Sequence, residues 1–427
     1  MTVKKFLALA CCLLLAAPAY ASWGVVKADL LSTTNDDGTE RDDELLCGQI
    51  VQILSEKNKA GLVDVKTEGR YETFLSPEAL VITEDEPAWA KERNRRVASI
   101  RADVLPQPDT SSYPPLISLP RASWVKAEQS KEKEWAQVTL PDGRVGFMKW
   151  ASLRQPRQWG EFDEAATRAN LVKDAVSYMG TGYRWGGKSP DGIDCSGLTA
   201  IVYDLNGLVI YRNSRPEAGF PIACIAPEAE PDGTFTLQDL DKMGLKPGDL
   251  LFWPGHTGMY LGNGKYIHSN GRTFDTCVNS LLKDDPDYRN DLATTQTLVS
   301  FGTAFPSAPD QLLVKELWAE PGERDGKKGW FIRVRAQGYA PTKVLIYPKG
   351  ADKPDDCIVV DAPRRMCLEK RGSTHKALPF VTYDEEGSYR PAVKLINDAG
   401  WLPGGKPIES DVVTLAEPLV WPMKETN

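Results

Sequence analysis

The sequence predicts an α+β domain in the middle of the chain, with small all-β domains before and after it. Apolar residues recur at helical spacing between residues 162 and 205, and short β-rich runs follow from residue 248 onward. In both flanks, runs of β-branched and aromatic residues alternate with turn sequences. We therefore expect helices packed on an antiparallel sheet within residues 160–307, and mostly strands elsewhere.

Residues 1–21 have the composition of a secretory signal peptide. Two lysines, Lys4 and Lys5, precede an apolar run at residues 6–17, and the Ala-Tyr-Ala at residues 19–21 is typical of a cleavage site. The run is too short to span a bilayer, and no later stretch is long enough. We therefore expect an exported protein of the periplasm or cell envelope, with no membrane span in the mature chain.

The composition argues against a nucleic acid as the main partner. The chain carries a net charge of −8 and has no long basic run, whereas phosphate binding needs clustered lysines and arginines. Its 427 residues are enough for roughly two to four domains.

The cysteines fit a chain made for an oxidising compartment, where some of them can pair. Cys357 and Cys367 are close enough in sequence to staple a hairpin or loop, and a bond between Cys224 and Cys277 is another possibility. The sequence leaves the connectivity open. One cysteine has to stay reduced if the protein uses thiol chemistry.

Two segments before the α+β domain, residues 22–84 and 95–155, are predicted to consist of short strands. A charged linker at residues 84–94 divides them. The segments end alike, with Gly-Arg-Tyr-Glu-Thr-Phe at residues 69–74 and Gly-Arg-Val-Gly-Phe at residues 143–147, which indicates a weak internal duplication. Both resemble bacterial SH3-like domains, so we expect two small SH3-like β-barrels. The expected strands are residues 23–26, 50–54, 62–66, 71–75, 97–100, 123–126, 135–140 and 145–148.

The central segment, residues 160–307, changes from helical to β periodicity along its length. Apolar residues recur at helical spacing between residues 162 and 179, and Asp163 is a suitable N-cap. From residue 248 onward β-rich runs follow, with a hairpin turn at residues 262–265. Helices followed by antiparallel strands are an α+β order. The expected strands are residues 248–253, 257–261, 266–269 and 298–305.

Cys195 is the candidate nucleophile of this segment. Leu198, Ile201 and Leu205 follow it at helical spacing, so we expect Cys195 in the first turn of a helix. The free N–H groups and the positive dipole end there favour a thiolate and lower the thiol pKa. The glycine-rich loop at residues 182–192 permits tight turns, and its N–H groups can stabilise an oxyanion. A buried, inert cysteine at a helix start is the alternative.

The base for such a nucleophile is scarce, because the chain has only three histidines. His256 begins one expected strand and His268 ends the next, and antiparallel pairing brings these ends together. A catalytic cysteine needs an imidazole to accept its proton and a third group to orient that imidazole. We therefore predict Cys195, His256 and His268 as the catalytic residues. Two structural histidines, or half of a zinc site, are the alternatives, although no further ligands at zinc spacing are evident.

Residues 310–420 are predicted to form a β-sandwich-like domain, because β-rich runs recur along them at the spacing of a sandwich. This segment carries no chemical motif, and its histidine, His375, lies in a polar turn. The expected strands are residues 312–319, 329–336, 342–347, 357–360, 378–383, 392–396 and 412–415.

The motifs of the central segment, taken in order, resemble those of the NlpC family, the papain-like cell-wall peptidases of bacteria. They are GYRWGGKSPDGIDCSG at residues 182–197, KPGDLLFW at 246–253, HTGMYLGNG at 256–264 and KYIHSN at 265–270. The resemblance covers about residues 162–305 and implies a papain-like fold. It implies that Cys195 is the nucleophile, His256 the general base and acid, and His268 the polar orienter. No metal or cofactor is implied.

The resemblance also implies a substrate class. NlpC enzymes cleave the bond between the γ-carboxyl of D-glutamate and a diamino acid, meso-diaminopimelate or lysine, in peptidoglycan stem peptides. Acyl transfer would pass through a thioester. The resemblance places Tyr183 near the oxyanion, Trp185 and Asp194 beside the substrate, and Ser196 at the α-carboxylate of D-glutamate. Plain packing is the alternative for Tyr183 and Trp185, and a helix-start hydroxyl is the alternative for Ser196.

A closer resemblance is to the subgroup of this family with SH3-like domains ahead of the catalytic domain, which look like dipeptidyl peptidases. It implies that acidic residues and a tyrosine, here Tyr71, hold the free amine of the substrate's L-alanine. Gln49 and Asn213 stand where the subgroup often has acids, and Ser214 follows as in the subgroup. An amide cannot match the charge-assisted bond of a carboxylate to an ammonium. We hypothesise that the demand for a charged N-terminus is relaxed here, or met by another group.

Two other functions are compatible with the sequence. One is a papain-like amidase or acyltransferase acting on another cell-envelope substrate. The other is a non-catalytic wall-binding protein, although a degenerate domain would be expected to lose a member of the cysteine and histidine set. For the leading hypothesis, the partner is either polymeric peptidoglycan or a free muropeptide.

Overall fold

The structure is a computed structural model in which part of the chain is described. The described residues are 22–217, 219–225, 233–293, 298, 300–307, 311–352, 356–362, 379–399 and 406–423. The predicted signal peptide at residues 1–21, as well as Cys367 and His375, lies outside them. In the described part of the chain, no helix is both long and apolar enough to cross a membrane.

The first β segment is an antiparallel sheet with the strand order β3-β2-β6-β5-β4-β1-β7. Among the described residues this sheet ends at β3 and β7, and the predicted closed barrel is not found. The edge strand β3 instead contacts β15 of the central segment. The SH3-like likeness stays a prediction. The strands are β1 (Ser22–Val26), β2 (Leu30–Thr34), β3 (Arg41–Leu46), β4 (Ile50–Ile53), β5 (Val63–Thr67), β6 (Glu72–Leu75) and β7 (Leu80–Thr83), with the 3₁₀ turn η1 (Pro77–Ala79) before β7.

The second β segment packs directly against the first. Cys47, which follows β3, is fully buried in the hydrophobic cluster of the second segment, together with Val97 and Val125. The predicted charged linker contains the short helix α1 (Trp89–Glu92). The strands are β8 (Arg95–Val97), β9 (Arg101–Val104), β10 (Ile117–Pro120), β11 (Trp124–Gln129), β12 (Trp135–Thr139), β13 (Val145–Lys149) and β14 (Leu153–Arg154), with η2 (Trp150–Ser152).

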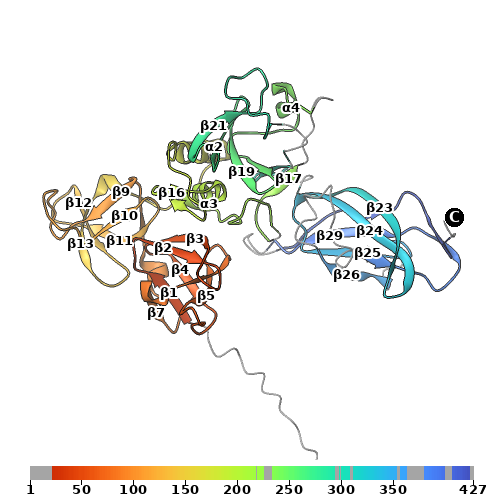
Figure 1. Ribbon diagram of the computed structural model, residues 1–427, viewed down its shortest axis with the longest axis horizontal. Coiled ribbons are helices and arrows are strands. Elements are labelled where there is room, and N and C mark those ends of the chain that lie inside the picture. Colours follow the sequence, from red (N-terminus) through yellow and green to blue (C-terminus); the bar gives the residue numbers. More distant parts are fainter. Residues whose placement is uncertain are drawn as a thin grey trace, which may run out of the picture.

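The central segment contains both predicted helices. α2 (Glu164–Val176) begins at the predicted N-cap, where Asp163 accepts a hydrogen bond of 2.8 Å from Ala166 N. α3 (Cys195–Leu205) follows the short pair β15 (Lys188–Ser189) and β16 (Gly192–Ile193). Figure 1 shows the first two β segments on one side of α3 and the C-terminal strands on the other.

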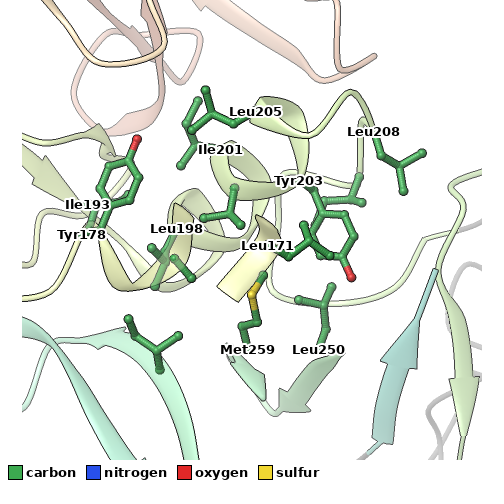
Figure 2. Packing of buried hydrophobic residues seen from close by; sticks show 14 of the residues in the cluster. Leu171, Tyr178, Ile193, Leu198, Ile201, Tyr203, Leu205, Leu208, Leu250 and Met259 are labelled. Carbon is green, nitrogen blue, oxygen red and sulfur yellow. The ribbon is translucent and has the colours of Figure 1, made fainter. Parts of the chain in front are cut away.

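The buried face of α3 holds the helix against the sheet. Figure 2 shows Leu198 and Ile201 of α3 packed with Leu171 of α2, Leu250 of β18 and Met259 of β19 in one buried cluster. This packing fixes the helix that carries Cys195. The predicted order of helices followed by antiparallel strands is confirmed. The elements are β17 (Ala223–Ile225), α4 (Leu237–Lys242), β18 (Leu250–Trp253), β19 (His256–Gly262), β20 (Lys265–Asn270), β21 (Asp275–Ser280) and β22 (Ser300–Thr303).

The C-terminal strands extend the central sheet, which the sequence did not predict. The order runs β21-β20-β19-β18-β22-β17-β24-β23, and the junction is the pairing of Ala223 with Tyr339 and of Cys224 with Gly338. A hydrophobic cluster then joins this sheet to the sheet of β25 and β29. The predicted domain boundaries stay a prediction. The strands are β23 (Leu312–Arg324), β24 (Lys327–Tyr339), β25 (Lys343–Tyr347), β26 (Ile358–Asp361), β27 (Phe380–Val381), β28 (Gly387–Tyr389), β29 (Ala392–Asn397), β30 (Ile408–Glu409), β31 (Val413–Thr414) and β32 (Leu419–Trp421).

Candidate active site

Cys195 is the first residue of α3, as the apolar spacing predicts. The N-cap is Asp194, whose Oδ1 accepts 2.6 Å from Gly197 N and whose Oδ2 accepts 2.8 Å from Gly186 N. Gly186 has a φ of 71°, which a residue with a side chain would adopt only with strain. The glycine loop thus folds back onto the N-cap and fixes the start of the helix.

The resting thiol of Cys195 is neutral, which corrects the prediction of a lowered pKa. Burial, with a smaller contribution from the negative charge of Asp194, raises the pKa of Cys195 to about 11. Backbone N–H groups of Thr257 and Ser196 act in the opposite direction and do not outweigh these effects. Cys195 is 7% exposed. A base must therefore remove the thiol proton during the attack itself.

The two histidines lie in contact at the end of the β19–β20 hairpin, as the sequence predicts. Nε2 of His256 is 2.7 Å from Nδ1 of His268. Two nitrogens bound to one tetrahedral zinc would be about 3.3 Å apart, so the pair does not have the geometry of half a zinc site. Among the described residues, no three His, Cys, Asp or Glu side chains form a group that could hold a metal ion.

Both imidazoles are neutral at rest. Burial lowers the pKa of His256 to about 3, with a further contribution from His268. Burial also lowers the pKa of His268 to about 4, although its hydrogen bond to Asn279 opposes the shift. A neutral imidazole can accept a proton, so His256 has the state that a general base needs.

Asn279 completes this group and was not predicted from the sequence. Its Oδ1 lies 2.9 Å from Nε2 of His268, and it belongs to β21, a short polar strand that is absent from the predicted strands. The sequence indicates only that Asn279 follows the strand that carries His268. His268 is thus bonded at both ring nitrogens.

The helix start is also held from the side by Arg212. This buried guanidinium donates to Asp194 Oδ2 at 3.1 Å and to Ser196 Oγ at 2.9 Å. Ser196 Oγ in turn lies 3.2 Å from Asp194 Oδ1. The Ser196 hydroxyl is therefore hydrogen-bonded within the protein, and its role at the α-carboxylate of D-glutamate stays a prediction.

Two buried acids of β3 face this network, and neither was predicted from the sequence. Asp43 pairs with Arg212 and accepts 2.8 Å from Lys188 Nζ. Glu44 Oε2 accepts 2.9 Å from Lys188 N, and its Oε1 lies 2.5 Å from Arg184 Nη2. The first β segment thus supplies negative charge to the loop that precedes Cys195.

Comparison with known proteins identifies the family. Residues 180–284 match the sequence profile of the NlpC/P60 family. The chain is 37% identical over 261 residues to a protein of Lysinibacillus sphaericus named dipeptidyl-peptidase 6, covering 60% of this chain and 90% of that protein. The chain belongs to the NlpC/P60 family. It is a peptidase of this family of cysteine peptidases.

Two more distant similarities involve Bacillus cereus. This NlpC/P60 chain is 28% identical over 141 residues to a protein named gamma-D-glutamyl-L-lysine dipeptidyl-peptidase, covering 31% of this chain and 37% of that protein. A solved NlpC/P60 family structure from the same species is 16% identical, with a TM-score of 0.48, over 66% of this chain and all of that one.

The predicted substrate residues of the NlpC/P60 site fall into two groups. Burial raises the pKa of Tyr183 to about 12, and a negative charge on Cys195, when its thiol is ionised, contributes to the shift. Trp185, on the same loop, is 67% exposed, so the packing alternative does not apply to it. Asp194 serves as the N-cap.

The second group lies around a cavity of about 260 Å³ between the first two β segments and α3. Gln49, Tyr71, Asp43 and Arg212 line this cavity. Gln49 Oε1 accepts 2.8 Å from Leu46 N, so this amide is engaged in its own turn.

Tyr211 connects the second group to Asn213. The ring of Tyr71 lies 6.4 Å from that of Tyr211, and Asn213 Nδ2 is 3.5 Å from the Tyr211 hydroxyl. Ser214 follows on this half-buried stretch.

Cys277, near the histidines, is a free thiol, so the suggested bond to Cys224 is not formed.

Proposed function

We propose that this chain is an exported cysteine peptidase that hydrolyses the bond between D-glutamate and a diamino acid in peptidoglycan stem peptides. The bond is the γ-D-glutamyl amide to meso-diaminopimelate or lysine. The observation that carries the proposal is the contact of His256 with His268 at 2.7 Å beside the helix that begins at Cys195. The Bacillus cereus relative is named a gamma-D-glutamyl-L-lysine dipeptidyl-peptidase, and this name supports the substrate class.

The geometry suits acyl transfer in two steps. Nδ1 of His256 accepts the thiol proton as the sulfur of Cys195 attacks the γ-carbonyl carbon of D-glutamate. The tetrahedral adduct collapses when the C–N bond breaks and His256 gives its proton to the leaving amine, which leaves a thioester on Cys195. Water, deprotonated by His256, then attacks the thioester and restores the thiol. Tyr183, whose pKa is raised in part by a negative charge on Cys195, is the candidate for stabilising the oxyanion.

The test is product analysis with L-Ala-γ-D-Glu-meso-diaminopimelate. Wild-type protein should release L-Ala-D-Glu and diaminopimelate, as identified by mass spectrometry. Cys195→Ala should release neither product, whereas Cys277→Ala, which removes another free thiol, should behave as wild type. Hydrolysis that survives Cys195→Ala would refute the mechanism. Parallel digestion of purified sacculi tells whether polymeric wall or free peptide is preferred.

We further propose that a charged N-terminus is not strictly required in the substrate. Gln49 and Asn213 are amides, and Gln49 is bonded within its own turn. A charge-assisted bond contributes about 1.5–3 kcal/mol, so its absence predicts that N-acetylation of the tripeptide changes kcat/KM by less than about tenfold. Asn213→Asp should then introduce a preference for the free amine.

A strong loss on N-acetylation would refute the relaxed requirement and point to another acid. Asp42 of β3 is the candidate. Burial raises the pKa of Tyr71, and the charges of Asp42 and Asp43 raise it further, so Asp42 lies close to that hydroxyl. In that case Asp42→Asn should abolish the preference for the free amine.

A further inference from the structure

The structure assigns Asn279 as a positioning residue that sets the tautomers of both histidines, so that His256 keeps an unprotonated Nδ1. The assignment rests on the proposed role of His256 as the base. It goes beyond that role because it explains which of the two ring nitrogens is able to accept the proton of Cys195.

The sheet register brings Asn279 to the histidines. β20 and β21 pair so that Tyr266 lies opposite Asn279 and His268 lies opposite Cys277. Directly opposed residues share a face of the sheet, and residues two apart on one strand share it as well. His268 and Asn279 are therefore diagonal neighbours on one face, and their side chains meet at 2.9 Å.

A backbone carbonyl fixes which way the Asn279 amide points. Nδ2 of Asn279 lies 3.1 Å from the carbonyl oxygen of Asp287. A carbonyl can only accept a hydrogen bond, so the amide must turn its N–H toward Asp287. Its Oδ1 then faces His268 as an acceptor.

The direction of the remaining bonds follows from this orientation. Because Asn279 Oδ1 accepts, Nε2 of His268 carries the hydrogen. A neutral imidazole has one N–H and one acceptor nitrogen, so Nδ1 of His268 is an acceptor. The 2.7 Å contact then requires the hydrogen on Nε2 of His256. Nδ1 of His256 is left with a lone pair.

Without an acceptor at position 279, the contact between the two histidines is compatible with a hydrogen bond in either direction. The reversed pair, with Nδ1–H of His268 donating to Nε2 of His256, satisfies the same contact. It places the hydrogen of His256 on Nδ1, where it can no longer accept a proton from the thiol. In the Ser-His-Asp triad, a residue that fixes the wrong tautomer lowers kcat about 10⁴-fold.

The first test is nuclear magnetic resonance of the resting protein labelled with ¹⁵N-histidine. The chain has only three histidines, so His375→Gln leaves the two of interest. Wild type should show the hydrogen on Nε2 of both rings. In Asn279→Leu, which cannot accept, a population with the hydrogen on Nδ1 should appear. Asn279→Asp, which keeps an acceptor oxygen, should retain the wild-type tautomers.

The second test is turnover of the tripeptide by the same variants. Asn279→Leu should lower kcat by more than about 100-fold with little change in KM, since a tautomer defect acts on the chemical step. Asn279→Asp should recover most of the loss. Cys277→Ala removes the neighbouring side chain opposite His268 without touching a ring nitrogen, so it should change neither tautomer nor kcat.

The two proposals fail in distinguishable ways. A hydrogen on Nδ1 of His256 in wild type, or an Asn279→Leu protein with wild-type tautomers and kcat, would overturn the assignment of Asn279. Absence of tripeptide hydrolysis by wild type would instead overturn the proposed function, and the resonance measurement on resting protein would still decide the tautomers. If Asn279→Leu fails to fold, wild type and Asn279→Asp decide the assignment.

Discussion

Asp43→Asn tests whether the first β segment is part of the active-site structure. The Asp43 side chain is 2% exposed and is paired with Lys188 and Arg212. Burial alone would raise the pKa of Asp43, but the charges of Arg212 and Lys188 outweigh it and hold the pKa below its usual value. The substitution preserves the shape and removes the charge that these two buried cations share.

Removing one partner of a buried ion pair costs about 3–5 kcal/mol. At about 1.4 kcal/mol per factor of ten, local opening should become roughly 150- to 5,000-fold more frequent. Hydrogen exchange of the β3 peptide, residues 41–46, measures this directly. kcat/KM should also fall by more than about tenfold, because Arg212 holds Asp194 and Ser196 at the helix start.

Glu72→Gln on the same sheet is the matched control. Glu72 pairs with Lys66 at 3.6 Å, and its side chain is 60% exposed, so its loss should cost less than about 1 kcal/mol. If Asp43→Asn had the same hydrogen-exchange rates and the same kcat/KM as this control, the first β segment would not support the active site. The reasoning from the buried ion pair would then be wrong.

Three further predictions concern protonation, the oxyanion and the loop. Since folded His256 and His268 have pKa values of about 3 and about 4, only the unfolded state gains these protons as the pH falls below about 6.5, so stability decreases. At pH 5 the free energy of unfolding should be lower by about 2 kcal/mol per histidine. Chemical denaturation of wild type and His268→Asn at pH 7 and pH 5 measures this loss. Equal pH dependence of the two proteins would contradict the prediction. Tyr183→Phe should lower kcat about 10²- to 10³-fold with a small change in KM if the hydroxyl serves the oxyanion, and an unchanged kcat would assign the ring to packing. Gly197→Ala should disrupt the loop before α3, because a Cβ there would lie 2.0 Å from Gly187 O; wild-type activity and hydrogen exchange of this variant would show that the loop is not tightly packed.

The helices and the hairpin of the central segment could be predicted because local sequence determines them. The apolar spacing after Cys195 defines α3, and the turn at residues 262–265 defines the hairpin that carries both histidines. These patterns depend on neighbours within a few positions. The same holds for the N-cap Asp163, whose partner Ala166 is three residues away.

The missed residues depend on partners far away in the sequence. A run of Arg-Asp-Asp-Glu normally lies in solvent, yet Asp43 is buried because Arg212, 169 positions away, neutralises it. Asn279 is likewise unremarkable until β21 pairs with β20. The pKa of Cys195 was predicted from the helix dipole, a local effect, and the burial that outweighs it comes from tertiary packing.

The errors in architecture have a similar origin. Strand patterns indicate the presence of strands but not which edges pair. In the described part of the chain, the edge strand β3 of the first sheet contacts β15, and the central sheet continues into β24 through a two-residue pairing with β17. Neither contact has a signal in the local sequence.

Trapping the acyl-enzyme tests directly whether Cys195 attacks the γ-carbonyl of D-glutamate. The protein is mixed with L-Ala-γ-D-Glu-meso-diaminopimelate, quenched in acid within milliseconds and analysed by peptide mass spectrometry. We expect an L-Ala-γ-D-Glu acyl group on the peptide that contains Cys195. Turnover with the acyl group on another residue, or with the diamino acid attached to Cys195, would contradict it.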